Sequence, residues 1–272
     1  MKKLSLSKNW LYIVLILMAV FYLLPLYVML VTGFKSFAEI DLKTMWNLPR
    51  GIAFDNYIEA FTKLKPFLLN SFIMVIPAAL ISSMIGSING FVFAKWKFPG
   101  SDIIYPFILF GMFIPYQAIL IPLVQFMNWI GVSGLPGLAM AHIIYGIPIT
   151  TLTFRNYYAS MPQELLEAGK LDGADMLGIY RYILLPISIP AFVVVLIWQF
   201  TSAWNDFLFA VVLTGNTDWP ITVALNNMAG SQIIAWNVQM AGSLLAALPT
   251  LLIYIFLGRY FLRGLLAGSL KG

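Results

Sequence analysis

Long stretches without a charged side chain constrain this sequence more than any other feature. A helix that crosses ~30 Å of hydrocarbon needs about 20 apolar residues, because each residue advances the helix by ~1.5 Å. Charge-free stretches of 26, 29, 52, 24 and 40 residues occupy 9–34, 66–94, 103–154, 182–205 and 219–258. The longest holds two spans, separated by the turn signal Gly131–Gly137. We therefore predict an all-α integral membrane protein with six transmembrane helices, at about 10–33, 67–94, 103–127, 136–157, 186–213 and 236–262.

The composition agrees with a chain that is embedded in a lipid bilayer. Hydrophobic residues make up 61% of the sequence and charged residues only 10%, against about 25% in soluble domains. Cysteine is absent, which excludes disulfides and thiolate metal sites in this chain. The single histidine, His142, is predicted to be a packed or hydrogen-bonded imidazole, because a metal site needs three or four ligands. The basic residues are scattered, so we expect no nucleic acid partner. Residues 1–272 are predicted to form a single transmembrane domain.

The positions of the basic residues predict the orientation. If the N-terminus is cytoplasmic, the inner loops and ends hold eleven Lys and Arg residues and the outer side five, all five within 35–65. Cytoplasmic loops carry the excess of Lys and Arg in membrane proteins. The first apolar run is too long for a signal peptide and no small-residue cleavage site follows it. We therefore predict a multi-pass protein of the cell membrane with both termini in the cytoplasm.

One cytoplasmic loop, residues 155–186, differs from a simple connector because it holds seven charged residues. Ser160 with Gln163 can form a capping box that starts a short helix with one apolar side. Gly173 ends that helix, since glycine adopts the left-handed conformation without strain. A second short helix is expected from 174 to about 182. Physical reasoning leaves two interpretations open: an interfacial helix packed on its own bundle, and a docking element for a cytoplasmic partner.

The same loop resembles a known family. Residues 167–174 read EAGKLDGA and precede Leu185-Pro186, which resembles the EAA loop of ABC importer permeases, usually E-A-A-x-x-D-G-A with a trailing L-P. Gly169 replaces the usual second alanine, at a local cost of about 1 kcal/mol. The likeness runs from about residue 10 to the C-terminus and is closest to the second permease of maltose-type carbohydrate importers. The other segments that carry it are Asn70-Ser71, Phe98-Pro99-Gly100, Ile121-Pro122-Leu123, Trp204-Asn205-Asp206-Phe207, and Arg259 to Leu265 with Ala267-Gly268.

This resemblance implies the ABC type I importer permease fold, with an EAA loop at about 158–186 that docks into a cleft of an ATPase subunit. In maltose-type relatives the tail of this subunit also reaches the ATPase, which here implies Gly268, Ser269 and Lys271. The residues implied to couple to the ATPase are Glu164, Glu167, Ala168, Gly169, Leu171, Asp172, Gly173, Ala174 and Met176.

No Gly-x-x-x-x-Gly-Lys-Ser/Thr loop occurs in the chain, so ATP and Mg²⁺ are expected on a separate ATPase polypeptide, with no cofactor and no enzyme activity here. The resemblance implies a subunit of a binding-protein-dependent importer that moves a mono- or oligosaccharide into the cytoplasm by ATP-driven alternating access. Its implied partners are a second homologous permease in a heterodimer, two ATPase subunits and an extracytoplasmic sugar-binding protein.

Two alternatives come from other classes of transport protein. An ion-coupled secondary carrier would need buried ionisable residues in several spans and often has inverted repeats. A channel subunit would need a ring of charges or a filter-like loop. The sequence shows neither feature. With one histidine, no cysteine and no paired intramembrane acids, it also offers no catalytic set for an intramembrane enzyme.

Polar and aromatic residues within the spans are candidates for the translocation pathway. Amides bond sugar hydroxyls, and aromatic faces pack against sugar rings; the alternative for each residue is an interhelical hydrogen bond. The candidates are Asn70, Asn89, Tyr116, Gln117, Gln199, Trp204, Asn205 and Asp206.

The carboxylate of Asp206 is expected to serve as a gate or a structural group rather than a proton relay, because it lies near the outer end of its span. Residues 34–66 and 214–235 are predicted to form the outer face. In the second segment Asn226, Asn227 and Gln232 are candidates for contact with a binding protein. A surface loop without that role would have the same composition.

Overall fold

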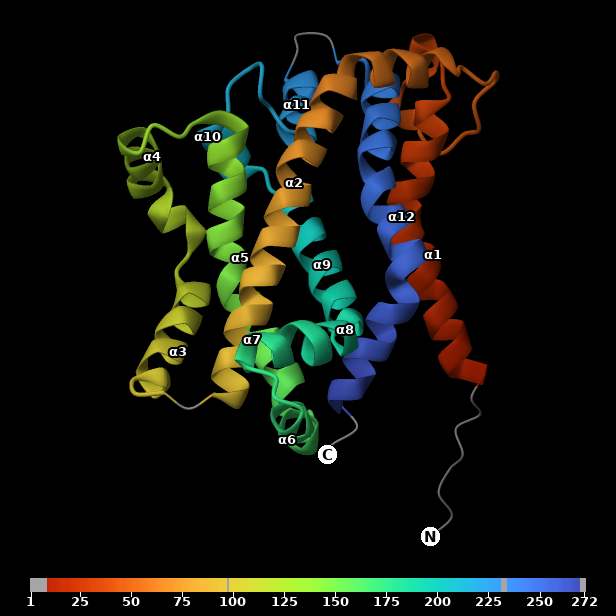
Figure 1. Ribbon diagram of the computed structural model, residues 1–272. Helices are drawn as coiled ribbons and strands as arrows, with labels where there is room; N and C mark the ends of the chain where they lie inside the picture. Colours follow the sequence, from red (N-terminus) through yellow and green to blue (C-terminus); the bar gives the residue numbers. More distant parts are fainter. Residues whose placement is uncertain (1–8, 97, 231–233, 270–272) are drawn as a thin grey trace. The chain divides into compact units, whose positions relative to one another are not determined.

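The computed structural model describes residues 9–96, 98–230 and 234–269, and the described residues contain helices and turns but no strand. The helices follow one another along the chain as in Figure 1. The α-helices are α1 (Asn9–Gly33), α2 (Asp55–Lys95), α3 (Ser101–Phe110), α4 (Leu120–Trp129), α5 (Gly134–Ala159), α6 (Glu164–Leu171), α7 (Met176–Gly178), α8 (Leu185–Ile187), α9 (Ile189–Trp204), α10 (Leu208–Leu213), α11 (Ile221–Ala229) and α12 (Trp236–Ser269). Shorter turns are the 3₁₀ segments η1 (Phe37–Glu39), η2 (Leu42–Thr44), η3 (Gly111–Phe113) and η4 (Tyr116–Ile119), and the π-helix η5 (Ile179–Leu184).

Four of these helices are long and apolar enough to cross a membrane: Trp10–Gly33, Asp55–Lys95, Gly134–Ala159 and Trp236–Tyr260. Two bent pairs bring the number to six if each pair forms one span. The six predicted spans therefore all correspond to helical segments of the structure. α2 begins well before its predicted span, because Asp55, Glu59, Lys63 and Lys65 occupy additional helical turns ahead of the charge-free run.

The third span is bent rather than straight. The helical segments Ser101–Phe113 and Tyr116–Trp129 meet at an angle of 93°. Ile114, between them, is extended (φ −76°, ψ 116°) because it precedes Pro115, whose ring disfavours a helical conformation in the residue before it. The prediction of one continuous helix over 103–127 was wrong at this point.

The fifth span differs from the prediction in two places. Its first segment, Met176–Ile187, meets Ile189–Trp204 at 75°, and both α8 and α9 carry a proline in the first turn, where the missing N–H costs no helical bond. The helix then stops at Trp204, and α10 starts only after the non-helical stretch 205–207. The second short helix, expected over about 174–182, is instead a single α-turn followed by the π-helix η5.

The described chain divides into two compact units. The first comprises the residues up to Lys65 together with Leu225–Ala247. Its small core consists of Ala60, Val238 and Ala241. Beside that core the buried Asn56 donates to the carbonyl oxygens of Gly33 (2.9 Å) and Lys35 (2.8 Å), which satisfies acceptors at the end of α1.

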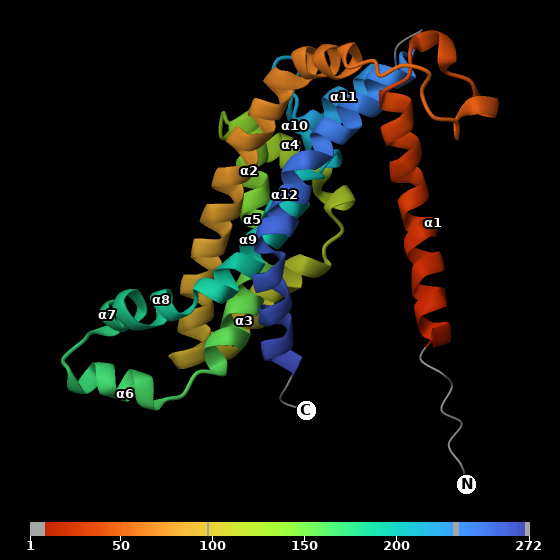
Figure 2. The ribbon, with the colours of Figure 1, turned by 90° about the vertical axis from the view of Figure 1, so that its right-hand side faces the viewer.

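The second unit, Pro66–Ala224 with the residues from Leu248 onward, holds the candidate site. Its core joins α2, α5, η5 and α9 through buried side chains, among them Phe91, Phe154, Tyr158, Leu184 and Val195. Figures 1 and 2 show α6, α7 and α8 at one end of α5, so that the chain leaves α5, runs out along α6 and returns through α7 and α8.

A candidate docking hairpin and a polar cavity

The segment from α6 to η5, residues 164–184, is here named the charged hairpin. Figure 2 shows its two arms extending away from α5 and α9. Its turn is a Schellman motif: the N–H of Ala174 donates to the oxygen of Gly169 (2.9 Å) and that of Gly173 to Lys170 (3.0 Å). Gly173 has φ +80°, as predicted for the residue that ends the first helix. Asp175 then accepts the N–H of Gly178 at 2.7 Å and starts the returning arm.

The start of the hairpin differs from the sequence prediction. Gln163, the residue before α6, already has helical dihedrals (φ −71°, ψ −27°) and makes no side-chain cap. The hydroxyl of Ser160 donates to the oxygen of Tyr157 (2.8 Å), so it closes the end of α5 instead of capping α6. The predicted capping box is therefore absent. Glu164 and Glu167 lie in the first turn of α6, where the helix dipole favours acidic side chains.

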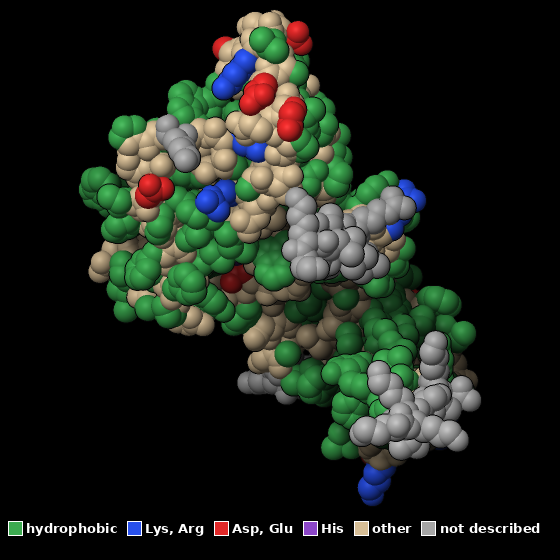
Figure 3. Space-filling model, turned by 90° about the horizontal axis from the view of Figure 1, so that it is seen from below, with side chains coloured by type: hydrophobic (Ala, Val, Ile, Leu, Met, Phe, Trp, Pro, Cys, Tyr) green, Lys and Arg blue, Asp and Glu red, His purple; other side chains and the backbone are tan. Residues whose placement is uncertain are grey.

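The first arm of the hairpin has one buried and one exposed side. Leu166 and Gly169 are buried against the returning arm, whereas Glu164, Glu167, Ala168, Asp172 and Gly173 are exposed. Leu171 is 88% exposed and Leu177, which sequence reasoning did not single out, is 68% exposed. Figure 3 shows acidic and basic side chains gathered on the lobe at the top of that view, where the hairpin lies. Exposed leucines among charged side chains on a projecting hairpin make this surface a candidate for protein docking.

Gly169, the departure from the usual alanine, packs closely against the returning arm. A β-carbon at this position would lie 2.7 Å from Cδ1 of Ile183 and 3.3 Å from Cγ1 of Ile179. The glycine therefore allows the two arms of the hairpin to approach each other. Ala174 and Met176, the remaining predicted coupling residues, are half-buried in the turn and the returning arm.

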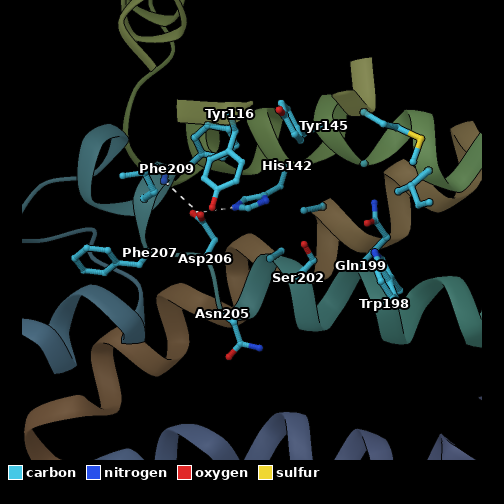
Figure 4. A pocket seen from close by; sticks show the side chains of 16 residues that line it. Tyr116, His142, Tyr145, Trp198, Gln199, Ser202, Asn205, Asp206, Phe207 and Phe209 are labelled. Carbon is cyan, nitrogen blue, oxygen red and sulfur yellow. Dashed lines mark hydrogen bonds and ion pairs between the residues drawn. The ribbon is translucent and has the colours of Figure 1, made fainter. Parts of the chain in front are cut away.

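A cavity of about 620 Å³ lies among α2, α5, α9 and α10, beside the break in the fifth span. Figure 4 shows Gln199 and Asn205 coming from α9 and its end, with His142 and Tyr145 on α5. Four predicted pathway residues line it: Tyr116, Gln199, Asn205 and Asp206. The structure adds His142, Tyr145, Trp198 and Ser202, which sequence reasoning did not propose as pathway residues.

Asp206 is the acidic group of this cavity, and its side chain binds the start of α10. Its carboxylate accepts the N–H groups of Ala210 (3.0 Å) and Phe209 (3.4 Å) in the first turn of α10. On its other side, Oδ2 of Asp206 lies 3.4 Å from Nε2 of His142. Figure 4 shows these two side chains facing each other. The imidazole of His142 therefore lies beside a carboxylate at the cavity wall, which its apolar surroundings in the sequence did not reveal.

Aromatic side chains form one wall of the cavity. The ring of Phe209 lies edge-on to Tyr116 (5.5 Å between centroids), Tyr145 (5.6 Å) and His142 (5.8 Å). The hydroxyl of Tyr145 donates to the oxygen of Ile114 at the bend of the third span. Gln199 is anchored from the other side, where its amide donates to Ser82 at 2.8 Å. Amide, hydroxyl and aromatic groups thus converge on one polar cavity.

The other four pathway candidates do not line this cavity. Asn70 donates to the backbone oxygens of Thr217 (3.2 Å) and Trp219 (3.1 Å), and Asn89 donates to Thr151 (3.4 Å). Trp204 is 2% exposed and stacks on Phe200 with 5.3 Å between ring centroids. Gln117, next to Tyr116, is exposed. The contacts of Asn70, Asn89 and Trp204 are those expected of packing and interhelical hydrogen bonding.

The remaining candidates are those for contact with the binding protein and for the C-terminal tail. Asn226 and Asn227 are exposed in the last turn of α11. Gln232 and Lys271 lie outside the described residues. Gly268 and Ser269 belong to the end of α12, and their side chains are not among those described. Across the described parts of the chain, no three His, Asp or Glu side chains are grouped to hold a metal ion.

Comparison with known proteins identifies the class to which this arrangement belongs. Residues 82–266 match the family described as binding-protein-dependent transport system inner membrane component. A probable ABC transporter permease of Pyrococcus horikoshii is 48% identical over the full length of both chains. The chain therefore belongs to this family of ABC importer permeases, and it is a multi-pass membrane protein.

Further relatives are named for their cargo. The chain is 37% identical to a xylose/arabinose import permease of Haloferax volcanii, over 90% of this chain and 87% of that protein. It is 33% identical to a glucose import system permease of Saccharolobus solfataricus, over 96% and 95% respectively.

Solved structures support the fold. A permease chain from the crystal structure of a bacterial ABC transporter involved in alginate import superposes with a TM-score of 0.79 at 21% identity, covering 96% of this chain and all of that one. A chain from a methionine ABC transporter in an inward-facing conformation gives a TM-score of 0.58 at 18% identity, over 76% and 98%. The chain thus has the fold of type I ABC importer permeases.

Proposed function

We propose that this chain is the permease subunit of a binding-protein-dependent importer that moves a sugar into the cytoplasm, with ATP hydrolysed by a separate subunit. The charged hairpin carries this proposal. Its Schellman turn holds α6 so that Leu166 and Gly169 are buried. Glu167 and Leu171 are then exposed and available to a partner. The partner that we assign to that surface is the ATPase. This chain has no phosphate-binding loop of its own, so the ATP and Mg²⁺ would be held by that separate subunit.

The polar cavity and the relatives support a sugar as the cargo. A hydroxyl-rich ligand needs donors and acceptors around its edge and an apolar face against its ring. Gln199, Asn205 and Ser202 supply the first, and Tyr116, Tyr145 and Trp198 supply the second. The relatives named for xylose, arabinose and glucose import point to the same class of cargo.

In the proposed mechanism, closure of the ATPase dimer moves the charged hairpin, and the hairpin moves the helices that flank it. The chain enters the hairpin from α5 and leaves it through η5 and α8 into α9, and both α5 and α9 line the polar cavity. A displacement of the hairpin therefore reaches the cavity walls through two helices. The remaining proposed partners are a second homologous permease, a second ATPase subunit and an extracytoplasmic binding protein that approaches the exposed amides of Asn226 and Asn227.

The test is ATP-dependent uptake by the complex assembled from this chain and the ATPase, permease and binding protein encoded with it. Membrane vesicles are given radiolabelled glucose, xylose or maltose in three samples: without ATP, with ATP, and with ATP plus a protonophore. We expect uptake that requires ATP and survives the protonophore. Uptake that needs a proton gradient and no ATPase would instead establish the ion-coupled carrier.

Charge reversal separates docking from insertion. Glu167→Lys reverses the charge on the exposed side of α6 and keeps a good helix former, so we expect normal membrane levels with weak ATPase association and no uptake. Asp102→Lys is the matched control, because Asp102 is exposed in the first turn of α3, outside the hairpin. ATPase recovery by Glu167→Lys equal to that of the control would contradict the docking assignment.

A further inference from the structure

Four buried hydroxyl groups lie next to one another where the charged hairpin joins the bundle. They belong to Ser87 of α2, Tyr158 of α5, Tyr180 of η5 and Ser188 between α8 and α9. Ser87, Tyr158 and Ser188 are 0% exposed and Tyr180 is 7% exposed. The site lies away from the polar cavity, since none of the four residues lines it.

The distances link these groups into one chain of hydrogen bonds. Oη of Tyr180 lies 3.0 Å from Oγ of Ser87, which lies 2.6 Å from Oη of Tyr158. Oη of Tyr158 lies 3.1 Å from Oγ of Ser188, and Oγ of Ser188 lies 2.9 Å from the backbone oxygen of Leu185. Tyr180 also lies 3.5 Å from the sulfur of Met84.

The direction of this chain follows from counting protons. A hydroxyl has one proton to donate, and a carbonyl oxygen can only accept. Ser188 donates to the oxygen of Leu185, so Tyr158 must donate to Ser188. Ser87 then donates to Tyr158, and Tyr180 donates to Ser87. Every proton is used once, and the chain runs in one direction from the π-helix to the bend before α9.

Aromatic packing holds the same residues in place. Phe91 of α2 stacks on Tyr180 with 5.5 Å between ring centroids, and Phe154 stacks on Tyr158 at 5.9 Å. The hydroxyls are therefore held at fixed positions and are buried from solvent, where a broken link leaves a buried polar group unpaired.

We propose that Ser87, Tyr158, Tyr180 and Ser188 are positioning residues that clamp both ends of the charged hairpin to α2, so that the hairpin and the walls of the cavity move together. Tyr158 lies just before the hairpin, whereas Tyr180 belongs to its returning arm and Ser188 follows it. Ser87 joins them from a third helix that is distant in sequence. The π-helix η5 is part of the device because it supplies Tyr180, and such turns are frequent at functional sites. This inference rests on the proposed function, because a clamp matters only if the hairpin is driven by a partner.

The first test needs only the purified full-length chain in lipid nanodiscs. Ser87→Ala removes the middle link and with it two hydrogen bonds, the one to Tyr158 and the one from Tyr180. We expect the backbone amides of 164–187 to exchange with deuterium at least about tenfold faster, because the loss of one buried hydrogen bond already accounts for about that factor. Ser83→Ala is the matched control, because Ser83 lies one turn earlier on α2, is 1% exposed, and its hydroxyl has no hydrogen-bond partner among the described residues. Equal exchange in the two variants overturns the clamp.

The second test measures sugar transported per ATP hydrolysed in the assembled importer. We expect Ser87→Ala and Tyr180→Phe to lower this ratio severalfold while ATPase association persists, and Ser83→Ala to leave it unchanged. Tyr180→Phe removes only the first donor, so it keeps the test open if Ser87→Ala accumulates poorly. An unchanged ratio in a variant with faster exchange overturns the positioning role. A wild-type complex without uptake counts against the proposed function alone, because the exchange experiment still decides the clamp.

Discussion

The charged hairpin and the polar cavity differ in how far apart along the chain their contacting residues lie. The hairpin is closed by bonds between near neighbours, such as Ala174 to Gly169 and Gly178 to Asp175. The cavity is closed by distant pairs, such as Gln199 with Ser82, which are 117 residues apart, and His142 with Asp206. We therefore expect substitutions in the hairpin to act locally and through partners, and substitutions around the cavity to act on the whole bundle or on the cargo.

The largest effect is expected from Gly173→Val in the hairpin. Gly173 has φ +80°, which strains a β-branched residue by about 1–2 kcal/mol, although no described atom beyond its chain neighbours lies within 4 Å of an added β-carbon. This strain should deform the Schellman turn, so we expect normal membrane levels, weak recovery of the ATPase and loss of sugar uptake.

Gly131→Val is the matched control for this change. Gly131 has φ +71° and equally open surroundings, but it lies in the turn between α4 and α5. The backbone strain is similar, whereas the docking surface is untouched, so ATPase recovery should be normal. If both variants lose the ATPase equally, general destabilisation explains the result and the hairpin has no special part in it.

Trp204→Ala should produce the next largest effect, this time on the stability of the bundle. Trp204 is almost fully buried and packs on Phe200 and Phe72, at 5.3 Å and 4.9 Å between ring centroids. Truncation of such a side chain leaves a void that costs roughly 3–5 kcal/mol. We expect a clearly lower thermal unfolding temperature in detergent, measured by tryptophan fluorescence. An unchanged unfolding temperature with reduced uptake would return Trp204 to the pathway.

Tyr116 and Gln117 offer a comparison between neighbours. Tyr116 lines the cavity, whereas Gln117 does not line it and is exposed. Tyr116→Ala removes an aromatic face from the site, a contact worth about 1 kcal/mol, so we expect sugar uptake to fall about fivefold in the concentration range below saturation. Gln117→Ala should leave uptake unchanged. Equal losses in the two variants would show that the cavity is not the pathway.

Sequence reasoning worked best where structure depends on near neighbours. The charge-free runs predicted the positions of the six spans, and the spacing in EAGKLDGA predicted the glycine turn at 173. It failed where a proline acts on a long helix: a hydropathy count does not register that Pro115 forces Ile114 out of the helix. It also predicted an ordinary short helix where the structure has the π-helix η5, because no local sequence pattern distinguishes the two.

The cavity could be predicted only in part, because it is closed by residues that are distant in sequence. Polar residues within spans are few, which directed attention to Gln199, Asn205 and Asp206. Nothing in the apolar surroundings of His142 indicates that Asp206 lies opposite, since that contact depends on how α5 packs beside the broken span. Asn70 and Asn89 have the same local character as Gln199, yet they bond to loops and helices elsewhere.

The smallest effect is expected at another site built from near neighbours, the turn after α1. The carboxylate of Glu39 accepts the N–H of Arg50 (2.9 Å) and the hydroxyl of Ser36 (2.8 Å), and these bonds hold the pKa of Glu39 below its usual value. A lowered pKa means that the bonds stabilise this turn above the ordinary pKa of a glutamate, and that this contribution is lost as the pH falls through the lowered value.

Glu39 is partly exposed in a surface turn, so water screens the effect and we expect it to be slight. Hydrogen exchange of residues 36–54 should quicken modestly between neutral pH and about pH 3.5, after correction for the intrinsic rate, in the purified chain. Glu39→Gln should exchange faster already at neutral pH and show no further change on acidification. The same pH dependence in Glu39→Gln would assign the effect to another carboxylate. It would also show that the contacts of Glu39 with Ser36 and Arg50 do not stabilise this turn.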